Sequence, residues 1–182
     1  MIQTPPPVRG ARWIPLTQSK FALVDARDYK RVSRYRWFFN AVSGGGYAAR
    51  KFDGKRVYLH NFIGSPPVGK RWDHIDRNAL NNRWSNLRAA TKANNGWNIG
   101  QHADNRTGFK GVTYKSKERV FIAQIGVGRK YLGKFAAPEA AARAYDAAAR
   151  CVFGEFACVN FPRRGERAAR RGGSMLRPEV KT

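Results

Sequence analysis

The polar, glycine-bounded stretch GQHADNRTG at residues 100–108 is the feature that most constrains what this chain can fold into. It lacks apolar periodicity and separates two segments that both have strand-like patterns. A chain of 182 residues can form one core, but domains of roughly 50 to 200 residues also allow two. The break therefore predicts two small domains, with a linker at 100–104.

The segment before the break is typical of a small antiparallel sheet. Aromatic and β-branched residues, which fit strands, are concentrated in the runs at 14–25, 34–52 and 55–63. Three consecutive glycines at 44–46 indicate a hairpin within the second run. Residues 26–37 between the first two runs suit a short helix.

The segment after the break predicts a three-stranded sheet and one helix. Strand-like runs occupy 110–115, 119–127 and 130–135. An alanine-rich helix follows at about 138–153, because Pro138 suits a first helical turn and Gly154 suits the position just past the end. Small side chains at helical spacing would let this helix lie close on the sheet, namely Ala140, Ala141, Ala144 and Ala148.

Both ends of the chain have compositions that do not build a core. Residues 1–12 contain three consecutive prolines and two arginines, which predicts a flexible basic arm. Residues 163–182 are rich in arginine and glycine and predict a flexible basic tail.

The formal net charge of +23, from 35 Lys and Arg against 12 Asp and Glu, indicates a polyanionic partner. It is +13 for residues 1–103, +5 for 104–162 and +5 for 163–182, so it is spread along the whole chain. An anionic membrane is the alternative partner to nucleic acid. It is disfavoured because the sequence has no amphipathic helix with a long apolar face.

The expected location is the cytoplasm of a bacterial or phage-infected cell. No stretch approaches the ~20 apolar residues of a membrane span, and the start lacks the apolar core of a signal peptide. Cys151 and Cys158 are too few for a cysteine-rich zinc site, and this compartment disfavours disulfides. We expect both thiols to be buried as small apolar residues.

A polar segment at 71–99 has the order strand, loop, strand and helix. Asp73-His74 precedes an Asn-rich loop, and an Asn pair closes the segment on a short helix. This text resembles the HNH endonucleases, specifically the homing-type members of phages and introns, over residues 13 to about 100. The matching residues are Asp73, His74, Ile75, Asn82, Asn86, Leu87, Arg88, Thr91 and Asn95. The resemblance implies an HNH domain at 13–99 with a ββα-metal finger at about 71–99.

Each residue type of the motif suits phosphodiester hydrolysis. A neutral imidazole with a pKa near 6.5 can take a proton from water, the role expected for His74. Oxygen donors suit Mg²⁺ or Mn²⁺, so Asp73 and Asn95 are the expected metal ligands. Asn86 is expected to hold the loop by side-chain to backbone hydrogen bonds and so to fix the imidazole.

Three residues in or near the motif are compared with the family pattern one by one. His60 stands where the family often carries a histidine, so it either supports the site, contacts a phosphate or packs structurally. Trp72 stands where the family usually has a small aliphatic residue. Arg77 replaces a common Gly or Asn in the turn after Ile75. Neither replacement removes an expected ligand.

Residues 105–162 resemble the Apetala/ethylene-response-factor (AP/ERF) DNA-binding domain over its full length. The text that carries the likeness is TGFKGVTYK, FIAQI, RKYLGKF, PEAAARAYDAAA and FGEFACVNFP. The resemblance implies a three-stranded sheet in the major groove, with Thr113 and Gly126 replacing two family arginines. The implied DNA-facing positions are Lys110, Lys115, Lys117, Gln124, Arg129, Tyr131 and Tyr145.

Together these features predict an α+β protein with a β-rich HNH domain followed by a sheet packed on one helix. The predicted function is a metal-dependent DNA endonuclease targeted by the AP/ERF-like domain. It would act as a monomer on double-stranded DNA, without a small-molecule cofactor. The alternative is a non-catalytic, sequence-specific DNA-binding transcriptional regulator with a degenerate HNH fold.

Overall fold

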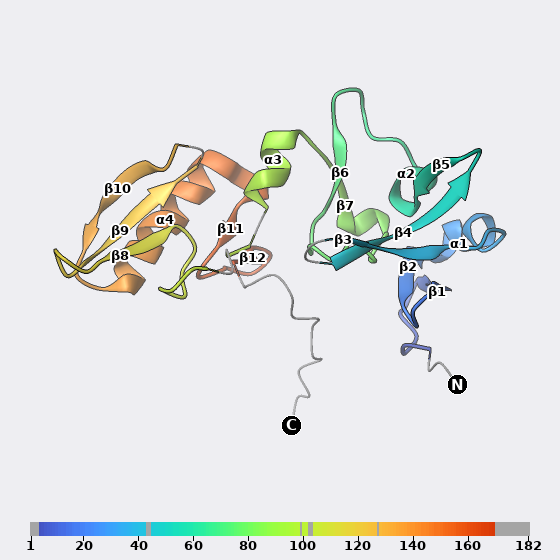
Figure 1. The fold of residues 1–182 in the computed structure, drawn as a ribbon, viewed down its shortest axis with the longest axis horizontal. Helices are drawn as coiled ribbons and strands as arrows, with labels where there is room; N and C mark the ends of the chain where they lie inside the picture. The colour runs from blue at the N-terminus through green and yellow to red at the C-terminus, as the bar shows by residue number, and fades with distance from the viewer. Residues whose placement is uncertain (1–3, 43–44, 99, 102–103, 127, 170–182) are drawn as a thin grey trace. The chain divides into compact units, whose positions relative to one another are not determined.

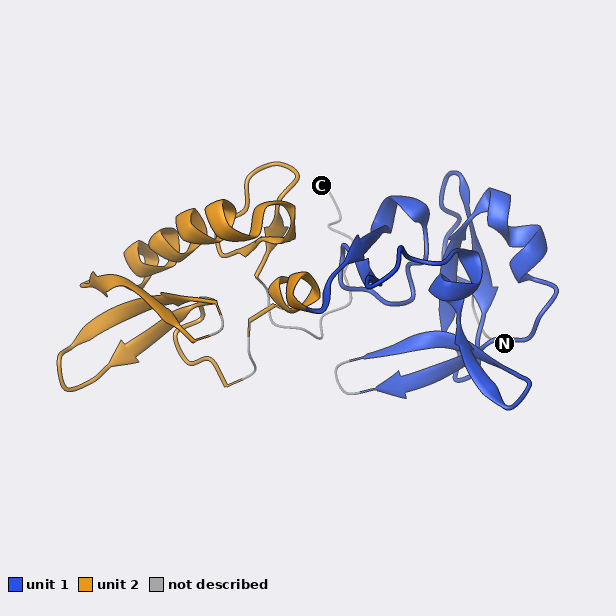
Figure 2. Ribbon diagram, turned by 90° about the horizontal axis from the view of Figure 1, so that it is seen from above, with its two compact units in different colours: residues 1–92 blue, residues 93–182 orange. Residues whose placement is uncertain are grey.

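The computed structural model describes residues 4–42, 45–98, 100–101, 104–126 and 128–169 (Figure 1). The chain divides into two compact units, residues 1–92 and 93–182 (Figure 2). Each unit combines small, mostly antiparallel sheets with few helices, which confirms the predicted mixture of strands and helices. No helix in the described ranges is long and apolar enough to span a membrane.

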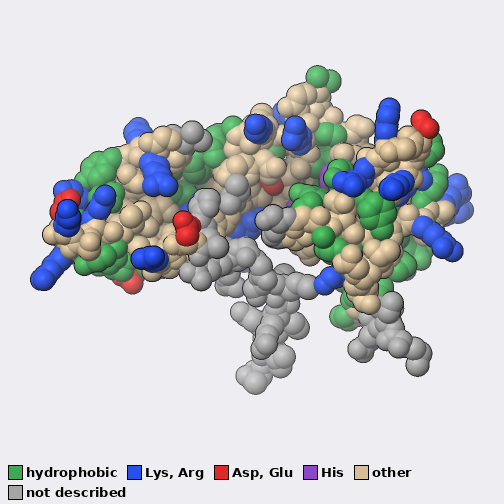
Figure 3. Space-filling view, in the orientation of Figure 1, with side chains coloured by type: hydrophobic (Ala, Val, Ile, Leu, Met, Phe, Trp, Pro, Cys, Tyr) green, Lys and Arg blue, Asp and Glu red, His purple; other side chains and the backbone are tan. Residues whose placement is uncertain are grey.

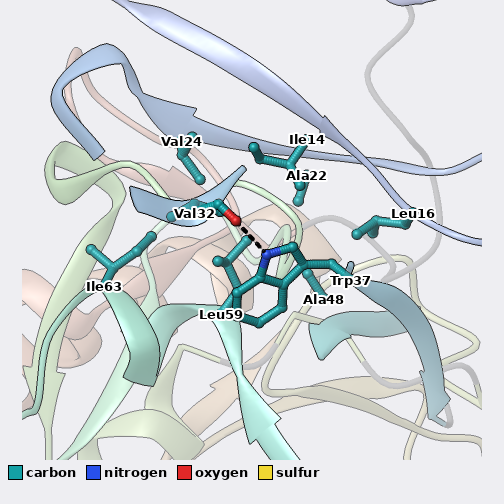
Figure 4. Close-up of a cluster of buried hydrophobic side chains, with 9 residues drawn as sticks. All are labelled: Ile14, Leu16, Ala22, Val24, Val32, Trp37, Ala48, Leu59 and Ile63. Carbon is teal, nitrogen blue, oxygen red and sulfur yellow. Dashed lines mark hydrogen bonds between the residues drawn. The ribbon is translucent and has the colours of Figure 1, made fainter. Parts of the chain in front are cut away.

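The first unit is built on a β-hairpin and a short helix. β1 (Ala11–Pro15) pairs antiparallel with β2 (Phe21–Asp25), and α1 (Ala26–Val32) follows directly. Trp37 donates its indole hydrogen to the Val32 carbonyl at 3.0 Å, which satisfies a polar group inside the core (Figure 4). The other buried side chains of this core are Ile14, Leu16, Ala22, Val24, Ala48, Leu59 and Ile63.

A three-stranded antiparallel sheet adds to this core. Its strands are β3 (Phe38–Val42), β4 (Gly45–Phe52) and β5 (Lys55–Tyr58). The predicted hairpin at the glycine run is therefore present between β3 and β4. Asp53 and Gly54 join β4 to β5 with φ angles of 48° and 68°, the left-handed pair that suits a two-residue hairpin.

The register of this hairpin decides which side chains share a face. Phe52 lies opposite Lys55 and Ala49 lies opposite Tyr58. Because side chains alternate along a strand, β4 presents two sets to opposite faces. One set is Tyr47, Ala49 and Lys51, and the other is Ala48, Arg50 and Phe52.

The remaining elements of the first unit surround the predicted metal finger. α2 (Leu59–Ile63) precedes β6 (Arg71–His74). After the Asn-rich loop, the 3-10 turn Trp84–Asn86 leads into β7 (Leu87–Ala90), which pairs antiparallel with β6. α3 then begins, so the predicted order of strand, loop, strand and helix is found.

The second unit begins within α3 (Lys92–Trp97) and is built around one sheet and one long helix. The sheet has the order β10-β9-β8, and α4 (Pro138–Phe153) packs on it through Ala141, Ala142 and Ala149 (Figure 1). Pro138 and Gly154 take the predicted positions at the helix ends. The strands are β8 (Val112–Lys115), β9 (Val120–Ile125) and β10 (Lys130–Phe135), as the sequence predicted.

Three expectations drawn from composition and spacing were wrong for the second unit. Ala140 is exposed, because it falls outside the stripe of α4 that faces the sheet. Cys151 is exposed on α4, whereas Cys158 is buried on β11 (Cys158–Val159). Part of the predicted flexible tail, residues 163–169, packs on the unit instead.

The packing of 163–169 has specific causes. β12 (Arg167–Ala168) pairs with β11. Arg150 makes two hydrogen bonds of 2.7 Å with the Glu166 carboxylate, which fixes the segment on α4. This charge pair lowers the pKa of Glu166 to about 2. Residues 170–182 of the predicted tail lie outside the described residues.

The division into units lies between Lys92 and Ala93, whereas the linker was predicted at 100–104. α3 therefore groups with the second unit, where Trp97 stacks on Phe153 with ring centroids 4.8 Å apart.

Candidate nuclease site

The candidate site lies where β6 ends. Asp73 lies opposite Arg88 in the hairpin, and His74 lies opposite Leu87. Asp73 and His74 are 4% and 7% exposed. Because neighbours on a strand point to opposite faces, the two side chains can serve one substrate only where the strand stops, and β6 stops at His74.

Asp73 forms a buried ion pair with Arg88. The Arg88 Nε and Nη2 atoms donate to Asp73 Oδ2 at 2.8 and 2.7 Å. The two side chains are 4% and 10% exposed, so little solvent screens the pair. The forked guanidinium therefore fixes the orientation of the carboxylate.

His74 is held as a neutral imidazole at neutral pH. Burial lowers its pKa below the ordinary value of 6.5, against opposing effects of Asn82, Asp76 and Asp73. His74 Nε2 lies 3.4 Å from Asn82 Oδ1. Since an amide oxygen only accepts, this contact is a hydrogen bond in the tautomer that carries its proton on Nε2. The neutral ring is the form that can accept a proton from water.

A cluster of rings surrounds this imidazole. The His60 ring packs edge-on against His74 at 5.3 Å and stacks on Tyr58 at 5.6 Å. Tyr47 lies 5.7 Å from His60 and 6.2 Å from His74. Burial, and then repulsion by the His74 ring when it is protonated, lower the pKa of His60 to about 4, so His60 is neutral as well.

Sequence reasoning missed Tyr47 and Tyr58. A signal for them was present, because Asp53-Gly54 is a preferred two-residue hairpin turn. The register set by that turn places both tyrosines on one face of the sheet. Asn82 was noted only as part of the motif, although its amide contacts the catalytic candidate.

Asn86 ties the two ends of the Asn-rich loop together. Its Oδ1 accepts the Asp76 backbone N–H at 2.9 Å. Its Nδ2 donates to Asp76 Oδ1 and to the Asn81 carbonyl, each at 2.8 Å. The backbone adds a bond of 2.8 Å from Ile75 N–H to the Asn86 carbonyl. The bonds to the Asp76 N–H and to the Asn81 carbonyl are the side-chain to backbone bonds expected of Asn86.

The loop is also fixed on the rest of the first unit. The Asn82 backbone N–H donates to the Leu23 carbonyl at 2.7 Å, and Leu23 N–H donates to the Leu80 carbonyl at 2.8 Å. Arg83 Nε donates to Asp25 Oδ1 at 2.9 Å. Strand β2 and its end therefore position the loop, and the loop in turn positions the imidazole.

The two unusual residues of the motif have local explanations. Trp72 donates its indole hydrogen to the Gly64 carbonyl at 2.7 Å and packs edge-on against Trp84 at 5.7 Å. Trp72 stands where the family usually has a small aliphatic residue, and its indole ties β6 to the end of α2. Arg77 has a φ of 63°, the left-handed conformation that explains why Gly or Asn would suit this turn.

Asn95 is exposed on α3, in the second unit. A carboxylate at Asp73 and an amide at Asn95 are oxygen donors, which fit Mg²⁺ or Mn²⁺ by their chemistry. Across the described ranges, no group of three or more His, Cys, Asp or Glu side chains could hold a metal ion. An ion at Asp73 would therefore take further oxygens from water and from the substrate phosphate, as Mg²⁺ commonly does.

The second unit presents three of its seven predicted DNA contacts, Lys115, Gln124 and Tyr131, on the open face of the sheet. Tyr131 pairs with Gln124, and Lys115 pairs with Val120. These positions alternate with the buried Ala123 and Ile125, so they face away from α4. Lys117 and Arg129 are exposed in the adjoining turns.

Tyr145 was wrongly predicted to face DNA. Its side chain is 3% exposed and packs in the core beneath the sheet. Burial raises the pKa of its hydroxyl, as expected for a phenol in apolar surroundings. Lys110 is half-buried, and its Nζ donates to the Trp97 carbonyl at 3.1 Å.

Comparison with known proteins agrees with the geometry of the first unit. The HNH endonuclease family profile matches residues 56–97, which include His60, Asp73, His74, Asn86 and Asn95. An uncharacterized HNH endonuclease of Acanthamoeba polyphaga mimivirus is 32% identical over 146 residues, or 77% of this chain and 74% of that protein. The chain therefore belongs to the HNH endonuclease family.

A second relative, Protein 3.8 of Escherichia phage T7, is 45% identical over 56 residues. That alignment covers 31% of this chain and 46% of the phage protein. No solved structure matches the chain significantly.

Proposed function

We propose that this chain is a metal-dependent, homing-type DNA endonuclease that hydrolyses phosphodiester bonds. The observation that carries the proposal is the buried, neutral His74 beside Asp73 at the end of β6, held by a loop that Asn86 closes. A neutral imidazole next to a carboxylate is the pairing of general base and metal ligand that hydrolysis of a phosphodiester needs.

His74 acts as the general base. In the tautomer that carries its proton on Nε2, facing Asn82 Oδ1, the nitrogen that accepts a proton from the attacking water is Nδ1. The rings of Tyr47 and His60 restrict the rotation of this imidazole. Restricting the base to one orientation lowers the entropic cost of reaching the transition state.

Asp73 and Asn95 would hold the divalent ion. Such an ion would neutralise charge on the scissile phosphate and on the leaving oxygen. Arg88 keeps the Asp73 carboxylate in one orientation through both of its donors. The Asp73 carboxylate is therefore oriented before DNA arrives.

The second unit targets the chain to double-stranded DNA. The open face of β8, β9 and β10 carries Lys115, Gln124 and Tyr131, and Arg129 adjoins it. Amide and guanidinium groups can read base edges, while lysines contact phosphates. The likeness of residues 105–162 to AP/ERF domains supports binding in the major groove by a monomer.

The test is relaxation of supercoiled plasmid by the full chain, with Mg²⁺ or with EDTA. We expect relaxation only with Mg²⁺, and its loss in His74→Ala, with DNA affinity kept within a few-fold because phosphate contacts dominate affinity. Val68→Ala, a fully exposed position outside the Asn-rich loop and outside the base and ligand set, serves as the control. DNA binding without cleavage under any divalent metal would reject the endonuclease and favour a DNA-binding regulator.

A further inference from the structure

A second feature of the first unit lies outside the nuclease chemistry. Arg50 on β4 sits among three rings, with its guanidinium carbon 4.0 Å from the Tyr35 ring centroid, 5.0 Å from Phe52 and 5.3 Å from Phe62. We call Tyr35, Arg50, Phe52 and Phe62 the aromatic patch. Arg31 adds a second guanidinium 5.3 Å from the Phe62 ring.

The aromatic patch is open to solvent. Phe52 is 61% exposed and Tyr35 is 42% exposed. The inner edge is fixed, because Phe62 packs edge-on against Tyr35 and against the buried Trp37, each at 5.4 Å. The patch is therefore a supported platform of rings.

Among the described residues, the guanidinium of Arg50 contacts only aromatic rings. Within the part of the chain that the structure describes, its side chain makes no hydrogen bond or ion pair, and its Nε is buried without a partner. A buried donor without a partner costs free energy. The ring contacts offset part of this cost, and the guanidinium keeps donors that no acceptor in the described residues uses.

The residues next to the aromatic patch are basic. Arg34 and Arg36 flank Tyr35, and Lys55 lies opposite Phe52 in the hairpin. All three are exposed. Figure 3 shows Lys and Arg side chains interspersed with hydrophobic ones on the surface of the first unit. Exposed rings next to cations are what a single nucleic-acid strand requires, because bases stack on rings while cations contact phosphates.

We propose that the aromatic patch binds single-stranded DNA by stacking unpaired bases on Phe52 and Tyr35 around Arg50. Duplex DNA does not fit this chemistry, since its bases are already stacked on each other. The proposal does not require the chain to be a nuclease, because it concerns binding alone.

The test measures the affinity of the full chain, in EDTA, for an oligothymidine strand and for an abasic strand of equal length and charge. Stacking adds to affinity only when bases are present, so the wild type should prefer oligothymidine by about tenfold or more. Phe52→Ala should remove most of this preference. Since Phe52 is largely exposed, this variant should keep the wild-type unfolding midpoint.

Matched variants separate stacking from charge. Tyr29→Ala removes another exposed tyrosine of the first unit, 39% exposed, and should leave the preference unchanged. Arg34→Ala should lower the affinity for both strands by the same factor, because it removes a phosphate contact.

Several results would overturn the proposal. One is an equal affinity of the wild type for the oligothymidine and the abasic strand. Another is an equal preference for oligothymidine in Phe52→Ala and Tyr29→Ala. A third is tighter binding of RNA than of DNA. A Phe52-dependent dimer in sedimentation would instead assign the patch to self-association.

Discussion

The buried pair of Asp73 and Arg88 gives the sharpest test of the site. Arg88→Met keeps the volume of the side chain but leaves a carboxylate that is 4% exposed without its counter-charge. Breaking a buried ion pair from one side typically costs about 3–5 kcal/mol. This is a large share of the roughly 5–15 kcal/mol that stabilises a folded domain.

The assay is urea unfolding of the full chain at neutral pH, followed by tryptophan fluorescence. Four of the five tryptophans, Trp13, Trp37, Trp72 and Trp84, lie in the first unit, so the signal reports mainly on that unit. With a slope of about 1–3 kcal/mol per molar urea, the midpoint should fall by at least about 1 M.

The matched control is Arg27→Met, which removes a pair with Asp28 whose atoms lie 3.7 Å apart and whose arginine is 69% exposed. Exposed pairs contribute about 0–1 kcal/mol, so its midpoint should move little. If Arg88→Met and Arg27→Met unfold at the same urea concentration, the orientation of Asp73 does not depend on its pair with Arg88, and the argument for a prepared ligand fails. Mg²⁺ should restore stability to Arg88→Met more than to the wild type, because a cation at Asp73 would replace the missing charge.

Three further predictions concern activity. Because the base must be neutral and burial lowers the pKa of His74, the nicking rate should stay constant as the pH falls through 6.5 and drop only below it; a rate that halves at or above pH 6.5 would contradict this. Asp73→Ala and Asn95→Ala should raise the Mg²⁺ concentration needed for half-maximal nicking, measured by titration, and an unchanged metal dependence would remove them as ligands. Arg129→Ala or Tyr131→Ala should flatten the cleavage-site profile more than they lower the maximal rate, and an unchanged profile would mean that the second unit does not direct the cut.

Local signals in the sequence were enough to predict much of the second unit. Pro138 and Gly154 mark the ends of α4 because one residue suits a first helical turn and the other adopts a positive φ of 51°. Tyr145 shows where resemblance alone misled. It lies four residues from Ala141 and from Ala149, both fully buried, so helical periodicity already placed it on the buried face.

The contacts around the candidate base could be predicted only in part. The hydrogen bonds of Asn86 are local, within a loop of about ten residues, and its residue type indicated them. The ion pair of Asp73 and Arg88 depends on the register between β6 and β7, which a long loop leaves undetermined. The ring cluster around His74 also includes Tyr47 on β4 and Tyr58 on β5. Tyr47 could therefore be found only from the register that the Asp53-Gly54 turn sets between these strands.

The candidate base and the aromatic patch share two elements of the first unit. β4 carries Tyr47 on the face toward His74 and Arg50 on the opposite face. α2 carries His60 against His74, and two residues later Phe62 against Arg50. A backbone change in either element would therefore disturb both sites together. Substitutions at exposed ring positions leave this shared backbone in place, so they can separate strand binding from hydrolysis.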